Sequence, residues 1–262
     1  MRENFSVHTQ NNSSHLLFSI NQFKGDKIIM IKFIISDLDD TLCDYQKAKN
    51  NAKSRINEYL IENFCVDILK FWRYYDLIEP QLFQQFIKKE ITRKEYRFHR
   101  YYEVLKRNSI DNSSLAKKLN YLYMKHANFN INLFDDVKPF FEFLAIQKIQ
   151  LAILTNGPLD GQKDKIRSLN LFEYVPRIYV SEEIGFSKPD KKAFDFVLGK
   201  INISPSQVLM IGDSFEIDIQ GARNAGISGI LVDRMNKYND ICRDVKIVKN
   251  LIELTNYIET QN

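Results

Sequence analysis

Short apolar runs recur along the second half of the chain, and stretches with helical spacing separate them. Together with residues 31–36, these runs predict the strands of one sheet, near 149–154, 177–180, 208–211 and 229–232. The intervening stretches predict helices near 138–147, 160–169, 190–200 and 216–225. A strand, a helix and a further strand at this spacing form a βαβ unit, which places parallel strands in one sheet. We therefore expect an α/β fold with a Rossmann-like parallel sheet that helices cover on both faces.

The segment between the first two predicted strands has a different pattern. From residue 44 to 135, apolar and aromatic residues recur at helical spacing, as in Ile56, Tyr59, Leu60 and Phe64. This spacing is typical of amphipathic helices, and no strand signal interrupts it. We expect four or five helices that pack as a bundle and are inserted into the α/β domain.

The predicted organisation is a core with an inserted cap. Residues 1–29 are rich in Asn and Ser and lack periodicity, so we expect a flexible N-terminal tail. We assign the α/β core to 30–43 and 136–262, and the α-helical cap to 44–135.

Composition and charge exclude several classes of protein. The 262 residues carry 37 basic and 33 acidic side chains, and the net charge of +4 is too small to indicate nucleic-acid binding by itself. No apolar run approaches the roughly 18 residues that cross a bilayer, and the first thirty residues do not resemble a signal peptide. We expect a cytoplasmic protein, a monomer or homodimer, that binds neither membrane nor nucleic acid. The basic, aromatic stretch 93–107 fits a helix with a solvated basic face, with an electropositive lid for an anionic substrate as the second interpretation.

Polar side chains follow the predicted strands at the point where each strand ends. In the order of the strands, these side chains are Asp37 and Asp39, Thr155 and Asn156, Lys188, and Asp213 with Asp218. Because ligands bind outside the carboxyl ends of parallel strands, we expect all of these side chains to meet at one edge of the sheet.

The residue types in this set indicate a binding site for a phosphoryl group. Four carboxylates in one crevice either raise one another's pKa values or demand a cation, and a hard ion such as Mg²⁺ takes oxygen ligands. A lysine, a threonine hydroxyl and backbone amides add the donors that the equatorial oxygens of a phosphoryl group need. The four histidines of the chain lie in the tail and in the inserted bundle, so no serine or cysteine nucleophile with a histidine partner is indicated.

Four short motifs carry a resemblance to a known family. They are DLDDTL at 37–42, LTNG at 154–157, SKPD at 187–190 and GDSFEID at 212–218. Their order and spacing resemble the four motifs of the haloacid dehalogenase-like (HAD) hydrolases, and the insertion after the first motif resembles the smaller α-helical cap of that family. The stretch from 181 to 198 most resembles the branch that contains pyrimidine nucleotidases and acylneuraminate 9-phosphatases.

The resemblance implies a role for each motif residue. Asp37 would attack phosphorus and form an aspartyl phosphate. Asp39 would protonate the leaving oxygen and then accept a proton from the hydrolytic water. Thr155 and the amide of Asn156 would hold phosphoryl oxygens, and Lys188 would neutralise charge on the nucleophile and the phosphate.

The resemblance also implies a metal site. Mg²⁺ would be bound by Asp37, by the backbone carbonyl of Asp39 and by Asp213. Asp218 would orient a metal-bound water or Lys188. Asp40 occupies a position where many members of the family have glycine, and we interpret it as a surface or flap residue.

We expect a Mg²⁺-dependent phosphatase that hydrolyses small organic phosphomonoesters. A nucleoside 5′-monophosphate is the leading substrate, ahead of sugar phosphates and phosphoglycolate-like acids. A dehalogenase needs no acid at the second position, so Asp39 argues against that reaction. A sugar-phosphate phosphomutase would keep the same motifs, and a non-catalytic binding protein would be expected to have lost one of them. The cap should close over the site, with hinges near 42–46 and 132–138.

Overall fold

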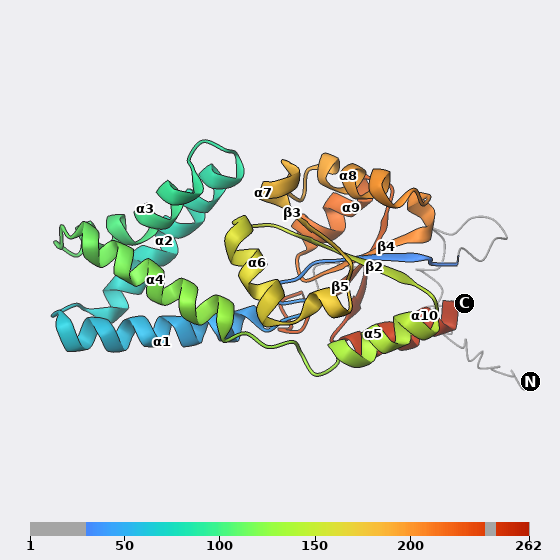
Figure 1. Cartoon of the computed structure of the whole chain (residues 1–262), viewed down its shortest axis with the longest axis horizontal. Coiled ribbons are helices and arrows are strands. Elements are labelled where there is room, and N and C mark those ends of the chain that lie inside the picture. The colour runs from blue at the N-terminus through green and yellow to red at the C-terminus, as the bar shows by residue number, and fades with distance from the viewer. Residues whose placement is uncertain (1–29, 239–244, 262) are drawn as a thin grey trace, which may run out of the picture.

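The computed structural model describes residues 30–238 and 245–261 (Figure 1). A bundle of four helices lies beside an α/β core, and the two parts are joined at one end of the core sheet. The predicted tail at 1–29 lies outside the described residues. No helix in the described ranges has the length and apolar character needed to span a bilayer.

Six parallel strands form the core sheet. They are β1 (Phe33–Ser36), β2 (Gln150–Thr155), β3 (Arg177–Val180), β4 (Val208–Gly212), β5 (Ser228–Val232) and β6 (Lys246–Val248). Their order in the sheet is β3-β2-β1-β4-β5-β6, with β1 paired to both β2 and β4. The predicted parallel sheet is confirmed, with five strands close to their predicted positions. The sixth strand was not predicted, because three residues with only one fully buried side chain give little signal.

Helices cover both faces of this sheet. They are α5 (Val137–Ile146), α6 (Leu159–Ser168), α7 (Ser181–Ile184), α8 (Lys191–Ile201), α9 (Gly221–Asn224) and α10 (Leu251–Gln261), with single 3₁₀ turns at Leu171–Glu173 and Pro205–Gln207. Strand β1 shows how the faces are divided, because side chains alternate along a strand. Ile34 packs into the cluster that contains α5 and α10. Phe33 and Ile35 pack on the opposite face, into the cluster that contains α8 and α9.

The connection after β4 is not the single helix predicted at 216–225. Residues Phe215–Gln220 wind as a π-helix, and only then does the α-helical turn α9 follow. The wider winding accompanies an inward-facing Asp218, whose carboxylate accepts a hydrogen bond from the N–H of Ser214 at 3.1 Å. A π-helical turn of this kind is often found at functional sites.

The inserted segment forms a four-helix cap with its own hydrophobic cluster. Its helices are α1 (Tyr45–Asn63), α2 (Ile68–Ile87), α3 (Arg93–Arg107) and α4 (Ser113–Phe129). Each begins at a residue whose side chain accepts a hydrogen bond from the first turn, namely Asp44, Asp67, Thr92 and Asn112. The predicted helical cap is confirmed.

The basic stretch 93–107 forms helix α3, but its basic side chains do not all face solvent. Arg100 is only 4% exposed, and its guanidinium lies 4.6 Å from the centre of the Tyr123 ring. It donates a hydrogen bond to Asn120 Oδ1 at 2.7 Å. The helix therefore buries a cation among aromatic rings inside the cap, where cation–π contacts offset part of the cost of desolvation.

The two chain segments that link cap and core are paired with each other. The N–H of Asp44 donates to the carbonyl of Asn132 at 3.0 Å, and the N–H of Phe134 donates to the carbonyl of Leu42 at 3.1 Å. These segments coincide with the hinges expected near 42–46 and 132–138. Because the two links are hydrogen-bonded to each other, any movement of the cap would bend both of them together.

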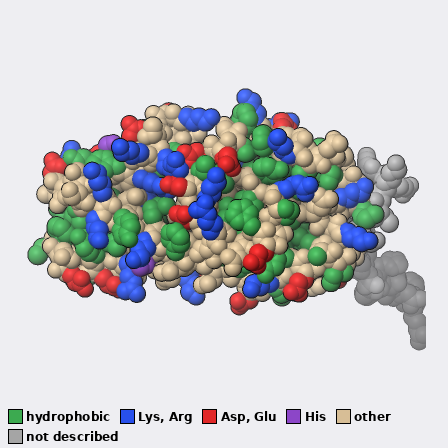
Figure 2. Space-filling view, in the orientation of Figure 1, with side chains coloured by type: hydrophobic (Ala, Val, Ile, Leu, Met, Phe, Trp, Pro, Cys, Tyr) green, Lys and Arg blue, Asp and Glu red, His purple; other side chains and the backbone are tan. Residues whose placement is uncertain are grey.

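Ion pairs also join the cap to the core on the side away from these links. Arg97 forms a two-pronged contact with Asp160 at the start of α6. Arg93 lies 3.2 Å from Asp160 and 3.7 Å from Glu182, and Lys89 donates to the carbonyl of Gly185 at 3.0 Å. Figure 2 shows acidic and basic side chains next to one another between the cap half and the core half of this face.

Replacing Arg97 with alanine should loosen the cap. The pair with Asp160 is charge-assisted but partly solvated, so we expect a loss of about 1 kcal/mol, which corresponds to about a fivefold larger population of undocked cap. Hydrogen exchange should then be faster at the amides that start α6. The matched control is Arg55→Ala, because Arg55 pairs with Glu58 within α1 and does not reach the core. Equal exchange in Arg97→Ala and wild type would show that this pair does not hold the cap.

Candidate active site

The candidate site lies at the carboxyl edge of the sheet, between β1 and β4. The strand order reverses at this point, and the crevice it leaves is where open α/β sheets bind ligands. Ser36 pairs with Ile211 in register, and the N–H of Asp37 donates to the carbonyl of Ile211 at 2.9 Å. Asp37 and Asp213 therefore leave neighbouring strands at nearly the same level.

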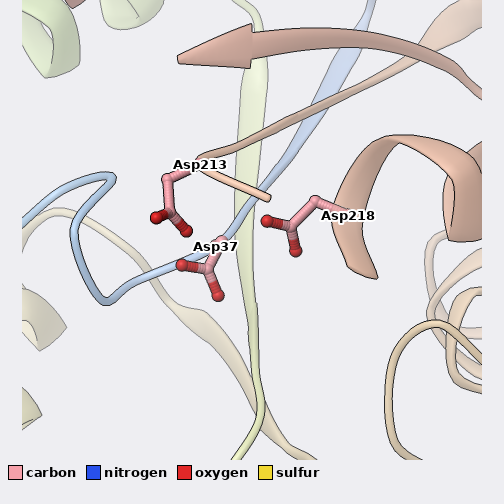
Figure 3. A group of neighbouring side chains, drawn as sticks. All are labelled: Asp37, Asp213 and Asp218. Carbon is pink, nitrogen blue, oxygen red and sulfur yellow. The ribbon is translucent and has the colours of Figure 1, made fainter. Parts of the chain in front are cut away.

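Three carboxylates converge in this crevice. Oxygen atoms of Asp37, Asp213 and Asp218 all lie within 4.8 Å of one another (Figure 3). Asp37 extends from the end of β1, Asp213 follows β4, and Asp218 comes from the π-helix. The expected meeting of Asp37, Asp213 and Asp218, which are far apart in the sequence, is observed.

Lys188 lies between two of these carboxylates. Its Nζ is 2.7 Å from Asp37 Oδ1 and 2.6 Å from Asp218 Oδ1, and the residue is only 3% exposed. Burial alone would lower the pKa of Lys188, but Asp218 and Asp37 raise it above its usual value. The two carboxylates therefore favour the charged form of Lys188 within the crevice.

A second lysine, Lys237, lies 3.2 Å from Asp213 Oδ2, but it is about half exposed, and two lysines do not balance three carboxylates. Burial raises the pKa of Asp37 well above its usual value, with Lys188 opposing the shift and Asp218 and Asp213 adding to it. Burial and the neighbouring Asp218 raise the pKa of Asp213 to about 6. A bound cation would favour the ionised form of both carboxyl groups and so oppose both shifts, and the oxygen donors fit a hard divalent metal ion.

Gly212 permits this close packing. A Cβ atom added to Gly212 would lie 2.3 Å from Asp218 Oδ2 and 2.6 Å from Asp218 Cβ. No side chain fits there while Asp218 points into the crevice. Glycine at the end of β4 therefore allows the π-helix to bring its carboxylate against the strand.

Thr155 and Asn156 lie at the end of β2, beside the crevice. Thr155 is buried, and its hydroxyl lies 3.5 Å from the carbonyl of Asn156. The Asn156 side chain binds the backbone of Lys188, donating to its carbonyl at 2.8 Å and accepting from its N–H at 3.0 Å. Asn156 thus positions the segment that carries the buried lysine, a contact that the sequence did not predict.

Asp39 has a different set of neighbours from Asp37. Lys165 Nζ lies 2.7 Å from Asp39 Oδ1 and 2.6 Å from Asp39 Oδ2. Gln162 Nε2 donates to Asp39 Oδ2 at 3.1 Å. The carboxylate of Asp39 is therefore held by two side chains of α6, and its side chain is 22% exposed.

Lys165 and Gln162 were not among the residues predicted for the site. They are three positions apart in the helix that begins just after the 154–157 motif, so they share the helix face that looks toward the end of β1. That spacing is a signal that sequence analysis could have used. The spacing was overlooked because α6 is rich in charged residues, which usually face solvent.

Asp40 does not join the carboxylate cluster. Its backbone has φ of +61°, a left-handed conformation that aspartate tolerates better than most residues. Its Oδ1 accepts a hydrogen bond from the N–H of Gln46 at 2.7 Å, and Lys49 lies 3.9 Å from its other oxygen. These contacts support the interpretation of Asp40 as a residue of the flap.

A cleft of about 560 Å³ lies between the cap and the core. It is lined by the turn from α2 to α3, including Lys89 and Arg93, and on the core side by Ser181 and Ser187. Ser181 accepts a hydrogen bond from the N–H of Gly157, and Ser187 directly precedes the buried lysine. The cleft therefore borders two of the loops that form the site.

Comparison with known proteins identifies a matching family. The model of the haloacid dehalogenase-like hydrolases matches residues 31–226. The match covers more than half of the chain and includes the cap and all four motifs.

Individual relatives agree with that match. The chain is 29% identical over 203 residues to the pyrimidine 5′-nucleotidase PynA of Streptococcus pneumoniae, covering 76% of this chain and 82% of the relative. It is 25% identical over 229 residues to a glyceraldehyde 3-phosphate phosphatase of Methanothermobacter thermautotrophicus, covering 86% and 95%. Among solved structures, the magnesium-bound HAD-hydrolase YfnB of Bacillus subtilis has a TM-score of 0.73 at 27% identity, covering 88% of this chain and 99% of that one.

The elevated pKa of Asp213 predicts a pH-dependent stability. A folded-state pKa of about 6, above the unfolded value, means that the group destabilises the metal-free protein above about pH 6 and ceases to do so as the pH falls toward 4. We expect Asp213→Asn to stabilise the metal-free protein by about 1–2 kcal/mol at pH 7.5, and this gain to vanish near pH 4. Urea unfolding in the presence of chelator measures it.

Two comparisons control this experiment. Asp195→Asn removes an exposed carboxylate of α8 that pairs with Lys191, and it should not stabilise the protein at any pH. Added Mg²⁺ should stabilise wild type more than Asp213→Asn, because the variant lacks one of the three carboxylates that could hold the ion. A variant that is no more stable than wild type at pH 7.5 would contradict the electrostatic account of the crevice.

Proposed function

Because the chain belongs to the haloacid dehalogenase-like hydrolases, we propose that it is a Mg²⁺-dependent phosphatase that hydrolyses small organic phosphomonoesters through an aspartyl phosphate. The observation that carries this proposal is the buried contact of Asp37 with Lys188, in a crevice that it shares with two further carboxylates. A nucleophilic carboxylate must stay ionised where burial favours its protonation, and a lysine at 2.7 Å serves that purpose.

The same crevice fits the metal that the proposal requires. Asp37, Asp213 and the backbone carbonyl of Asp39 would hold Mg²⁺, which would neutralise the carboxylates and polarise a phosphoryl oxygen. Asp218 is better suited to orienting than to ligation, because one of its oxygens accepts from Lys188 and the other from the N–H of Ser214.

In the first step, a carboxylate oxygen of Asp37 forms a bond to phosphorus while the bond from phosphorus to the leaving oxygen breaks. The electron pair stays on the leaving oxygen, which takes a proton from the carboxyl group of Asp39. Lys188, Thr155 and the amide of Asn156 stabilise the charge on the phosphoryl oxygens.

In the second step, a water oxygen attacks phosphorus and gives its proton to the carboxylate of Asp39. The bond from phosphorus to Asp37 breaks, which releases inorganic phosphate and restores both carboxyl groups to their starting states. The ion pairs of Arg97 and Arg93 with the core keep the cap over the crevice, and a docked cap limits access of water during the first step.

Asp37→Asn should abolish phosphate release while the fold is retained. Asparagine is nearly isosteric with aspartate but is a poor nucleophile, so we expect a loss of at least about 10⁴-fold in kcat with 4-nitrophenyl phosphate. Chelation of divalent metal should abolish wild-type activity as well. The matched control is Asp195→Asn, which should retain full activity. Near wild-type turnover by Asp37→Asn would remove the nucleophile assignment.

The substrate class is the finer part of the proposal, and we propose a nucleoside 5′-monophosphate. The resemblance of 181–198 to the nucleotidase branch and the 29% identity to PynA support this class, whereas the identity to a glyceraldehyde 3-phosphate phosphatase favours a small sugar phosphate as the second candidate.

A phosphate-release panel at equal concentrations tests the substrate class. It should include pyrimidine and purine 5′-monophosphates, triose and hexose phosphates, and small phospho-acids. We expect kcat/KM for the best pyrimidine 5′-monophosphate to exceed that for any sugar phosphate by about tenfold or more, which corresponds to about 1.4 kcal/mol of differential binding in the transition state. A higher kcat/KM for a sugar phosphate would contradict the nucleotide assignment and support the second candidate. Transfer of label to a sugar instead of water would identify a phosphomutase.

A further inference from the structure

We propose that Lys165 is a positioning residue for the leaving-group step, which it serves by fixing and stabilising the carboxyl group of Asp39. The proposal rests on the phosphatase function given above, and it assigns a role to a residue outside the four motifs. It starts from the contact of the Lys165 ammonium with both oxygens of Asp39, at 2.7 and 2.6 Å.

Lys165 is built into the protein and is not a mobile surface lysine. The residue is 2% exposed, and its Nζ lies 3.4 Å from the centre of the Tyr45 ring. An ammonium group that contacts an aromatic face and a carboxylate has little freedom to turn to other partners. Burial of its charge is costly unless the charge is paired, so Lys165 and Asp39 depend on each other.

Gln162 completes the support of Asp39. Its Nε2 donates to Asp39 Oδ2 at 3.1 Å and to the carbonyl of Asn156 at 2.8 Å. A Cβ atom added to Gly157 would lie 2.9 Å from the same Nε2, so glycine leaves room for this amide. The first turns of α6 thus link the 154–157 motif to the acid/base residue.

The chemistry explains why such support matters. A carboxyl group can give its proton to the leaving oxygen and still accept a hydrogen bond from Lys165 on its other oxygen. When the proton has moved, a carboxylate remains, and the ammonium beside it stabilises the new negative charge. Donors that are already oriented toward charge that develops in the transition state need no reorganisation at that moment. Lys165 therefore acts through Asp39, at the step where the leaving oxygen needs a proton.

This role predicts a dependence on the leaving group. 4-Nitrophenolate departs readily without a proton, whereas phenolate is a poorer leaving group and benefits more from an acid. Lys165→Met should therefore lower kcat/KM for phenyl phosphate about ten- to a hundredfold more than for 4-nitrophenyl phosphate, with Mg²⁺ present. Lys165→Arg keeps the charge and should recover part of the difference.

The ratio of the two rates makes the experiment robust. Any fraction of misfolded variant lowers both rates equally and cancels in the ratio. The matched control is Lys163→Met in the same helix, because Lys163 pairs with Glu183 at 3.1 Å on the surface, and its ratio should equal that of wild type. In an Asp39→Asn background, Lys165→Met should produce no further change in the ratio, because the two residues act as a unit.

Each possible result either supports or contradicts the proposed role of Lys165. A selective loss with phenyl phosphate, recovered in part by arginine and absent in Asp39→Asn, supports the proposal. An unchanged ratio in Lys165→Met overturns it, whether both rates fall together or neither falls. If wild type releases no phosphate from either ester, the proposed phosphatase function itself fails and the role of Lys165 fails with it.

Discussion

The buried ammonium of Lys188 is the interaction on which the rest of the site depends. It contacts Asp37 and Asp218 inside a crevice where burial disfavours every negative charge. Removing one partner of such a buried pair typically costs about 3–5 kcal/mol, because the other charge is left without compensation. The surrounding structure is arranged to keep this lysine in place: Asn156 holds its backbone, and Gly212 leaves room for the carboxylate on its other side. The remaining negative charge is what makes the crevice selective for a cation.

Much of the fold and of the site could be predicted from the sequence, for a physical reason. Buried parallel strands are continuous apolar runs, and the residues that follow them must meet at one edge of the sheet. This logic brought Asp37, Lys188 and Asp213 together correctly. It missed Lys165, because the partner of this residue depends on how α6 packs against the end of β1, and its spacing from Gln162 was the one local signal in a helix rich in charged residues. The short strand β6 was missed for a related reason, because its extended conformation depends on pairing with β5 more than on its own three residues.

The links between cap and core show a similar dependence on distant residues. Arg234 follows β5, yet its guanidinium donates to the carbonyl of Thr41 at 3.0 and 2.9 Å and to the carboxylate of Asp136 at 2.9 Å. It lies 3.9 Å from the centre of the Phe134 ring. One side chain of the core thereby contacts both links at their base. The expected hinge would then lie beyond Arg234, in the stretch where the two links are paired with each other.

The two aspartates of the first motif are consequently tied to different parts of the molecule. Asp37 is held by Lys188 and by backbone of the sheet, all within the core, so its geometry does not depend on where the cap lies. Asp39 is held by Lys165, whose ammonium rests on the ring of Tyr45, and Tyr45 packs against both the core cluster and the cap cluster at the start of α1. Tyr45 therefore connects the cap cluster with the support of the proposed acid/base, whereas the contacts of the proposed nucleophile lie within the core. On the proposed mechanism, a shift of the Tyr45 ring would change the support of the acid/base residue, whereas the contacts of the nucleophile would stay as they are.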